Sequence, residues 1–528
     1  MRFLKKIPPW IYLFFFAGAA LFQVWLVRDV VMGDAFIHFV FARGINEGQP
    51  FFYNGEFSAG STSPLWSILL AFIYKLTGDG IIGSVKIFAS FFVALSVLLT
   101  FNLGYKVSKN KIISLASSFL VATSFVLSFW AAKGMETPFY VCLVLGSFLI
   151  YLTIIDLPSK KTDLGLEILL GLLLGLGILA RPEMWFFSLF IGIPLLLKRG
   201  WRVIFSVGIP AFLIFCPYYF WLYENTQQFF PSSMARILRA RQWALELHGI
   251  FFSLEILKIL FTKLLPLTPF AIFFFCSRVN SSNTQSKTPD ISQININSNR
   301  LVLYPIYAWL FFHLIFFSLV FPTTEGYRYI LAALPFFYLI ALLGIWKIRK
   351  IRYRHILLAL ALIGSVVIST QQLLERMDSV KNCEQPFIDK TRRNVGLWIR
   401  ENTNANDLIA MKEVDQSAFY GKRKMLSVDG TLDTKAIPFV KNGDQLGFFQ
   451  QEKPDYFILE EEMYREYPNW GKSNVLPLIN SNPQIEETQT ISEIKFTLLE
   501  KIKSGDAKNC QHFSAEYHWW IFGVEYAK

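Results

Sequence analysis

Long apolar runs recur through the first 370 residues, and they constrain the fold more than any other feature. The first run, PPWIYLFFFAGAALFQVWLV at 8–27, has no charged residue and is long enough as a helix to cross ~30 Å of hydrocarbon. A cleaved signal peptide is the alternative, but the run is long for one and no small-residue cleavage motif precedes Arg28. Because 53% of the 528 residues are hydrophobic, the sequence predicts an integral membrane protein.

The apolar runs predict about eleven spanning helices. They lie near 8–27, 87–105, 112–130, 137–155, 165–180, 184–197, 203–222, 252–276, 301–320, 329–346 and 356–370. Lysine and arginine gather in every second connection, which predicts a cytoplasmic N-terminus. The run PLWSILLAFIYKL at 64–76 is short and carries a lysine near its end, so we assign it to an interfacial helix on the outer surface. The net charge of +12 therefore indicates topology and not nucleic-acid binding.

The predicted fold class is a polytopic α-helical membrane protein with a C-terminal extracytoplasmic α/β domain. The membrane domain covers 1–370, with an outer loop at 28–86 and a flexible cytoplasmic loop at 277–300 that is rich in Ser, Asn and Thr. In the tail, 371–528, helical patterns such as KTRRNVGLWIREN alternate with the short apolar runs DLIAM, KMLSV and DYFILE. An odd number of spans places this tail outside the cytoplasm.

The outer loop begins with three charged or titratable candidates on one helical segment. Asp34 precedes the run AFIHFVFA, so it is either the N-cap of that helix or a catalytic carboxylate, and the local sequence favours neither. His38 lies one turn later, a spacing that a general base or a metal pair would use, although a hydrogen-bonded interfacial histidine is commoner. Arg43 is four residues before Glu47, and it either contacts substrate or pairs with Glu47 to support the helix.

Other outer helix ends carry further candidates. Glu136 precedes a helix start, where a negative charge is favourable in any case. Arg181 and Glu183, in the motif RPE, join two short apolar runs, and charges below the membrane surface are retained for pairing or function. Arg236 belongs to a basic stripe that suits a phosphate or anionic lipid headgroups equally, and Arg328 either binds a ligand or pairs with nearby Glu325.

Several chemistries lack their usual motifs. The sequence has no P-loop, no GxGxxG, no HExxH and no CxxC pair. Hydride transfer, ATP-driven transport and zinc hydrolysis therefore have no support.

The segment GDAFIHFVFARGINEGQPFFYNGEFSAGSTSPLW, 33–66, resembles the first outer loop of bacterial GT-C membrane glycosyltransferases, particularly those akin to the mycobacterial terminal arabinofuranosyltransferases. The motifs GMETPFY, LLLGLGILARPE, FPSSMARI and GYRYILAALP and the tail segment LWIRENTNANDLIAM follow in the order of that family. One departure is that the usual paired aspartates are here Gly33 and Asp34. If the missing acid is a metal ligand in the family, dependence on a divalent cation such as Mg or Mn is in doubt.

The resemblance implies transfer of a sugar from a polyprenyl-phosphate donor to a hydroxyl of an envelope glycan or glycolipid, on the outer face of the bacterial cytoplasmic membrane. It implies Asp34 as the catalytic base. Substrate-binding roles then fall to His38, Arg43, Glu136, Arg181, Glu183, Arg236 and Arg328. The arginines suit the lipid phosphate, and the two glutamates orient either sugar hydroxyls or those arginines.

Two other classes remain open. A transporter or flippase of lipid-linked sugars would place charges at mid-helix depth along a path, usually with repeat symmetry, whereas the charged motifs here gather at helix ends. A non-catalytic glycan-binding membrane protein predicts that neutralising Asp34 leaves function intact.

Overall fold

The computed structural model describes most of the chain in two compact units. The first unit comprises Met1–Arg28, Lys86–Tyr219 and Ala240–Glu375, and the second Asp29–Val85, Phe220–Arg239 and Arg376–Lys528. The residues described are 7–29, 33–53, 56–58, 60–158, 163–227, 229, 231, 264, 266–279, 300–317, 325–382, 385, 390–412, 414–430, 432–461, 473–504 and 517–527. The second unit thus groups Asp29–Val85, most of the predicted outer loop, with the tail, and the division into domains at residue 370 stays a prediction.

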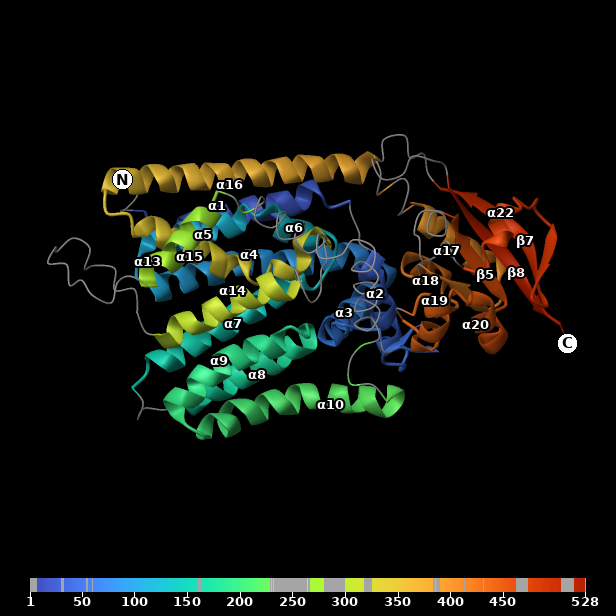
Figure 1. Cartoon of the computed structure of the whole chain (residues 1–528), viewed down its shortest axis with the longest axis horizontal. Coiled ribbons are helices and arrows are strands. Elements are labelled where there is room, and N and C mark those ends of the chain that lie inside the picture. The colour runs from blue at the N-terminus through green and yellow to red at the C-terminus, as the bar shows by residue number, and fades with distance from the viewer. Residues whose placement is uncertain are drawn as a thin grey trace. The chain divides into compact units, whose positions relative to one another are not determined.

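The first unit is built from helices (Figure 1). They are α1 (Pro9–Leu26), α4 (Ile81–Ser108), α5 (Lys111–Ala122), α6 (Phe125–Ala132), α7 (Thr137–Asp156), α8 (Leu164–Ala180), α9 (Met184–Arg199), η2 (Ile204–Gly208), α10 (Ile209–Thr226), α13 (Thr268–Val279), α14 (Arg300–Ile315), η5 (Glu325–Ile330), α15 (Leu334–Trp346) and α16 (Ile351–Ser379). Helices α4, α10 and α16 continue past the limits of the unit.

These helices lie at the positions of the predicted spans. Within the described residues, five are long and apolar enough to cross a membrane, or six if α5 and α6, bent by 44°, form one span. Of the predicted span 252–276, only the end is described, in α13, and most of the loop 277–300 lies outside the described residues. The chain is therefore a multi-pass membrane protein, and the count of about eleven spans stays a prediction.

Local sequence explains where several of these helices begin and end. The side chain of Asn110 accepts hydrogen bonds from the first amides of α5, and that of Asp163 does so for α8. Gly200 ends α9 with a positive φ of 72°, a conformation that glycine adopts without strain. Proline occupies the first turn of α1 and α7, where no amide donor is required.

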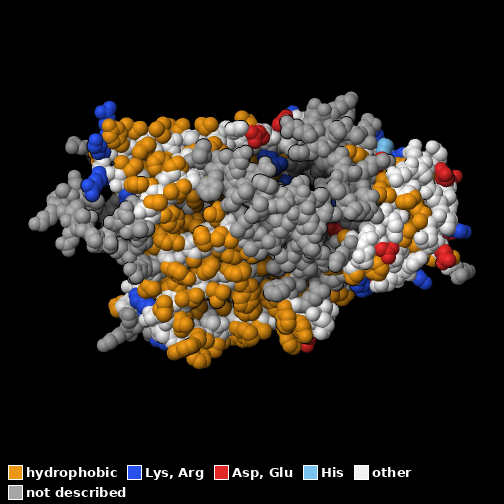
Figure 2. Space-filling model, in the orientation of Figure 1, with side chains coloured by type: hydrophobic (Ala, Val, Ile, Leu, Met, Phe, Trp, Pro, Cys, Tyr) orange, Lys and Arg blue, Asp and Glu red, His pale blue; other side chains and the backbone are white. Residues whose placement is uncertain are grey.

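The surface of the first unit is largely apolar. Figure 2 shows hydrophobic side chains over most of the described surface of these helices on the face drawn. The most exposed include Ile87 and Leu197, both at 77%, and Trp201 at 74%. In a soluble protein such a surface would aggregate, whereas lipid tails cover it at no cost.

Close helix packing in this unit depends on glycine. A Cβ on Gly344 of α15 would lie 2.0 Å from the carbonyl oxygen of Phe270 in α13, and one on Gly171 of α8 would lie 2.3 Å from that of Val207 in η2. Small residues let helix backbones approach in a membrane, where lipid leaves little hydrophobic drive for association.

The second unit combines the outer loop with an α/β domain. The loop forms α2 (Gly33–Asn46), the hairpin of β1 (Phe52–Tyr53) and β2 (Glu56–Phe57), α3 (Pro64–Thr77) and η1 (Gly78–Gly80). The domain contains α17 (Lys390–Asn402), β3 (Leu408–Met411), α18 (Gln416–Gly421), β4 (Lys424–Ser427), η7 (Thr434–Ala436), α19 (Ile437–Asn442), α20 (Gln445–Glu452), β5 (Tyr456–Glu460), α22 (Pro477–Asn480), β6 (Thr488–Ile491), β7 (Ile494–Lys503) and β8 (His518–Tyr526).

Strands β3 to β8 form one mixed sheet in the order β4-β3-β5-β8-β7-β6. Strand β3 runs parallel to β4 and β5, with Ile409 opposite both Met425 and Tyr456, and the remaining pairs are antiparallel. Its aromatic core includes Phe449, Phe457, Phe496, Trp520 and Phe522, all buried. The runs DLIAM, KMLSV and DYFILE are β3, β4 and β5, so the predicted α/β character of the tail is confirmed at these elements.

Candidate active site

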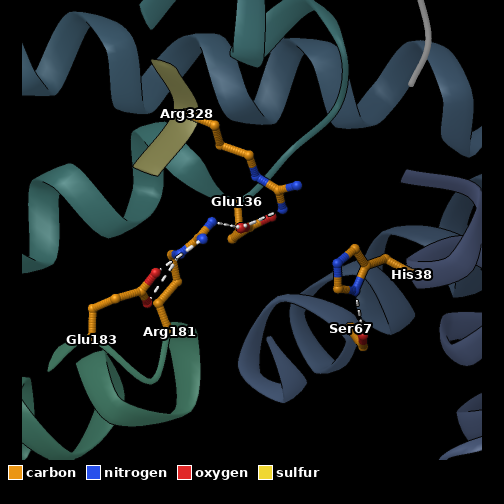
Figure 3. A network of polar contacts seen from close by, with 6 residues as sticks. All are labelled: His38, Ser67, Glu136, Arg181, Glu183 and Arg328. Carbon is orange, nitrogen blue, oxygen red and sulfur yellow. Dashed lines mark hydrogen bonds and ion pairs between the residues drawn. The ribbon is translucent and has the colours of Figure 1, made fainter. Parts of the chain in front are cut away.

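The first unit brings four of the predicted side chains together at the ends of different helices (Figure 3). Glu136 is the residue directly before α7, and Glu183 is the residue directly before α9. Arg181 follows α8 in extended conformation, with φ −159° and ψ 139°, and Arg328 lies in η5. These charged residues lie next to the ends of apolar helices. Glu136, Arg181 and Arg328 are far apart in the sequence, and the packing of the helices brings them together.

These four side chains form a continuous ion-pair cluster. Arg181 Nη1 lies 2.5 Å from Glu136 Oε1, and Arg328 Nη2 donates to the same oxygen at 2.9 Å. Arg181 also faces both oxygens of Glu183, with Nη2 3.2 Å from Oε1 and Nε 3.4 Å from Oε2. The contact between Arg181 and Glu183, with two N–H groups facing two oxygens, has the fork geometry that a guanidinium makes with a carboxylate or a phosphate.

Burial makes this cluster costly unless its charges are paired. Glu136 is 1% exposed, Arg328 5% and Arg181 7%. Burial opposes the charge of Arg181, but the carboxylates of Glu183 and Glu136 outweigh it and hold the pKa of Arg181 above its ordinary value. Two arginines and two glutamates sum to zero charge, so the cluster is balanced as it stands.

Aromatic rings line the two guanidinium groups. The Arg181 guanidinium lies 4.7 Å from the ring centre of Tyr329, and that of Arg328 lies 5.3 Å from the ring centre of Trp130. Such contacts hold the planar groups in place and allow them to bind a planar or tetrahedral anion with little loss of side-chain freedom.

The second unit holds the candidates of the outer loop. Helix α2 begins at Gly33, so Asp34 lies in its first turn and is not the residue that caps it. A carboxylate there is stabilised by the helix dipole. His38 is 4% exposed, and its Nδ1 lies 2.9 Å from the hydroxyl of Ser67 in α3 (Figure 3).

Arg43 contacts α18 of the sheet domain through hydrogen bonds to backbone carbonyls, and its guanidinium lies 5.7 Å from the ring centre of Phe419. It is 5% exposed, and its Nη1 donates to the carbonyl of Phe419 at 3.0 Å and its Nη2 to that of Ala418 at 3.5 Å. These carbonyls belong to α18 of the sheet domain, in the same unit. The guanidinium therefore joins the outer loop to that domain.

Two more residues of the outer loop make similar contacts. The Tyr53 hydroxyl donates to the carbonyl of Val414, and the Ser58 hydroxyl to that of Leu432 at 2.7 Å. Burial, reinforced by the negative charge of Asp415, raises the pKa of Tyr53 well above its ordinary value. Loop and sheet domain are thus held together by buried hydrogen bonds within one unit.

Sequence reasoning missed Arg392 and Asp415, which lie against the start of α2. A Cβ added to Gly33 would be 1.9 Å from Asp415 Oδ2 and 3.2 Å from Arg392 Nη1. The available signal was Gly33 itself, at a position where the resembling family carries an aspartate.

The remaining predictions for the site have no described geometry. Arg236 lies outside the described residues. Within the part of the chain that the structure describes, no group of three or more His, Cys, Asp and Glu side chains is placed to hold a metal ion. Dependence on a divalent cation stays an open prediction.

The fold can be compared with those of solved structures. A crystal structure of ArnT from Cupriavidus metallidurans bound to undecaprenyl phosphate superposes with a TM-score of 0.59 at 10% sequence identity, covering 97% of each chain. An Archaeoglobus fulgidus oligosaccharyltransferase in complex with Zn and sulfate has a TM-score of 0.49 at 11% identity, covering 87% of this chain and 70% of its own. No protein-family model matches the sequence. No curated protein matches it either.

The likeness to ArnT extends over nearly the whole of both chains. The protein therefore shares the overall fold of that ArnT structure. The assignment to the arabinofuranosyltransferase-like group stays a prediction.

Proposed function

We propose that the protein transfers a sugar from a polyprenyl-phosphate donor to a hydroxyl group of a cell-envelope glycan or glycolipid. The observation that carries this proposal is the full-length likeness to ArnT, which was solved bound to undecaprenyl phosphate. The proposal includes the predicted topology of about eleven spans in the bacterial cytoplasmic membrane, with the N-terminus cytoplasmic and the sheet domain on the outer face.

The proposed reaction is a single displacement at the anomeric carbon of the donor sugar. The acceptor hydroxyl oxygen forms a bond to that carbon, the bond from carbon to the phosphate oxygen breaks, and its electron pair leaves with the polyprenyl phosphate. The Asp34 carboxylate takes the proton of the acceptor hydroxyl as general base. A single displacement inverts the configuration of the anomeric carbon.

The proposed roles of Arg181 and Arg328 follow from the charge that develops on the leaving phosphate. Arginine suits this task because it stays protonated and presents two N–H groups in the geometry of a phosphate edge. Glu136 holds one N–H group of each arginine, at 2.5 and 2.9 Å, and so fixes where both guanidinium groups lie. Glu183 holds a second edge of Arg181.

Three further residues keep proposed roles as substrate contacts. His38 lies on the same face of α2 as Asp34, one turn away, and its contact with Ser67 fixes the ring. Arg236 is proposed for the phosphate on the sequence resemblance alone. Arg43 keeps this role on the sequence resemblance, since its hydrogen bonds here go to carbonyls of α18.

The proposal is tested by mass spectrometry of the polyprenyl-phosphate lipids of cells that carry wild-type protein, no protein, or Asp34→Asn. Loss of transfer is expected to make one glycosylated carrier accumulate in both defective strains, and the mass of that carrier identifies the sugar. The variant must be present in the membrane in normal amount, which an immunoblot checks.

Unchanged carrier pools in both defective strains would contradict the proposal and favour the transporter or glycan-binding alternatives. Accumulation in the deletion strain with normal pools in Asp34→Asn would leave the transferase standing and exclude Asp34 as its base.

A further inference from the structure

The carboxylate of Asp415 fills the space where residue 33 would carry a side chain. Its Oδ2 atom is 1.9 Å from the position of a Cβ on Gly33, and its carboxyl carbon is 3.0 Å from that position. Real Cβ atoms do not approach an oxygen so closely, so any larger residue at 33 must displace the Asp415 carboxylate. The first residue of α2, next to Asp34, is therefore in direct contact with a charged group of the sheet domain.

The Asp415 carboxylate is fixed on both oxygens. Oδ1 accepts from the amide of Gln416 at 2.5 Å and so caps α18, and Oδ2 accepts from Arg392 Nη1 at 2.6 Å. The Asp415 side chain is 7% exposed and that of Arg392 15%. Both groups lie mostly out of solvent, where a charged hydrogen bond is stronger than in water.

The topology of the sheet explains why these charges meet there. Asp415 follows β3, and Glu460, whose Oε1 lies 4.0 Å from Arg392 Nη2, ends β5. Strand β3 lies between β4 and β5 and runs parallel to both. The chain passes from β3 to β4 on one side of it and then crosses to β5 on the other side. In open α/β sheets, the crevice at the carboxyl ends of two such strands is where ligands bind. Here the N-terminal turn of α2 lies against that edge.

We infer that Asp415, held by Arg392, is a positioning residue for Asp34. The inference rests on the proposed function, in which Asp34 is the general base. Asp415 fixes the backbone of Gly33, and the first-turn backbone sets where the Asp34 carboxylate points. Other contacts hold α2 through Phe36 and Phe39 against Phe419 and through Arg43. The contact at Gly33 lies at the residue directly before Asp34.

Swapping the residue types at positions 33 and 415 tests this role. Asp415→Gly removes the carboxylate but keeps an acceptable N-cap for α18, since glycine is well tolerated at that position. A misplaced general base costs about 10- to 100-fold in turnover, so Asp415→Gly is expected to slow transfer by that factor. Gly33→Asp alone is expected to fail as well, because its side chain collides with Asp415. The double variant, Gly33→Asp with Asp415→Gly, returns a carboxylate to the same space and is expected to recover most of the lost turnover.

Transfer is measured with purified full-length protein added to membranes of a deletion strain, which supply donor and acceptor together. Mass spectrometry follows the disappearance of the glycosylated carrier. Binding of undecaprenyl phosphate to the same variants is expected to stay within about 3-fold of wild type, since the inference assigns Asp415 to the base and not to the phosphate. Asp444→Gly is the matched control, because Asp444 caps α20 of the same domain by accepting from Gly447 at 2.9 Å. It is expected to transfer at the normal rate.

Hydrogen exchange of α2 separates a local effect from loss of the fold. Asp415→Gly is expected to increase hydrogen exchange in the first turn of α2 and to leave the strands of the sheet protected. The double variant is expected to reverse that increase. The inference would be overturned if Asp415→Gly turned over at the normal rate, or if the double variant recovered no activity. The proposed function would still stand in that case, provided that wild-type protein is active and Asp34→Asn is inactive. If wild-type protein consumes no glycosylated carrier, the proposed function fails and the inference fails with it.

Discussion

Buried charge is accommodated in two ways, which Glu136 of the helical unit and Arg43 of the second unit illustrate. In the helical unit, Glu136 is bonded to the guanidinium groups of Arg181 and Arg328, so side chain balances side chain. In the second unit, Arg43 is as deeply buried but donates to the backbone carbonyls of Phe419 and Ala418.

The surroundings of the two groups explain this difference. Arg181 and Arg328 both lie within hydrogen-bond distance of the Glu136 carboxylate. Arg43 lies beside the short helix α18 and donates to the carbonyls of Phe419 and Ala418, the second of which also accepts from the amide of Lys422. Replacing Glu136 therefore leaves buried charge without that partner, whereas replacing Arg43 removes the charge together with its hydrogen bonds.

The largest effect is expected from Glu136→Gln. The variant keeps the shape of the side chain but leaves two buried arginines facing a neutral amide, and breaking a buried ion pair costs about 3–5 kcal/mol. We expect the largest loss of thermal stability among the variants described, measured by intrinsic fluorescence of purified protein in detergent.

The matched control in the same unit is Asp156→Asn. Lys106 Nζ lies 3.8 Å from Asp156 Oδ2, and the two side chains are 25% and 38% exposed. Solvent screens this pair, so the change is expected to stay within about 1 kcal/mol. Equal losses in Glu136→Gln and Asp156→Asn would contradict the distinction between buried and screened pairs.

Arg43→Met is expected to have an intermediate effect. The methionine preserves apolar volume but removes the charged hydrogen bond to Phe419 at 3.0 Å, which contributes about 1.5–3 kcal/mol, and the longer contact with Ala418 at 3.5 Å adds little. Hydrogen exchange of α2 and α18 measures the loss locally. Asp79→Asn, which breaks the exposed pair with Lys422 at 3.1 Å, serves as control and is expected to leave both helices protected.

The smallest effect is expected from Tyr53→Phe. Loss of the hydrogen bond to Val414 costs about 1 kcal/mol. Because the pKa of Tyr53 is raised in the folded state, its contribution to stability is complete below the ordinary tyrosine pKa and is lost as pH rises beyond about 10. Thermal unfolding at neutral and alkaline pH is expected to show a smaller alkaline loss in the variant than in wild type, and an equal loss would exclude this role of Tyr53.

Helix positions could be predicted from sequence because apolar runs and the charges between them mark both ends of each segment. The run PLWSILLAFIYKL is α3, directly followed by η1 and α4, and the helical pattern KTRRNVGLWIREN is α17. Strands β6, β7 and β8 were not predicted individually. Their partners are set by long-range antiparallel pairing, such as Phe457 with Phe522, which no local pattern specifies.

The sequence predicted which charged residues belong to the site but not which of them form ion pairs with one another. Glu136, Arg181, Glu183 and Arg328 all stand out as charges at the ends of apolar runs, yet their grouping depends on how four separate elements pack. Arg392 and Asp415 resemble ordinary surface residues of a helix and a cap. Their placement against Gly33 depends on close approach of two segments more than 350 residues apart, which only the fold determines.

The central claim is that this protein is a glycosyltransferase with Asp34 as its base. The most direct measurement adds purified wild-type protein or Asp34→Asn to the glycosylated polyprenyl phosphate isolated from deletion-strain membranes, together with those membranes as acceptor, and follows release of free polyprenyl phosphate. We predict release with wild type and a rate at least about 100-fold lower with Asp34→Asn, with undecaprenyl phosphate binding retained. Equal rates of release from the two proteins, or none from wild type, would contradict the claim.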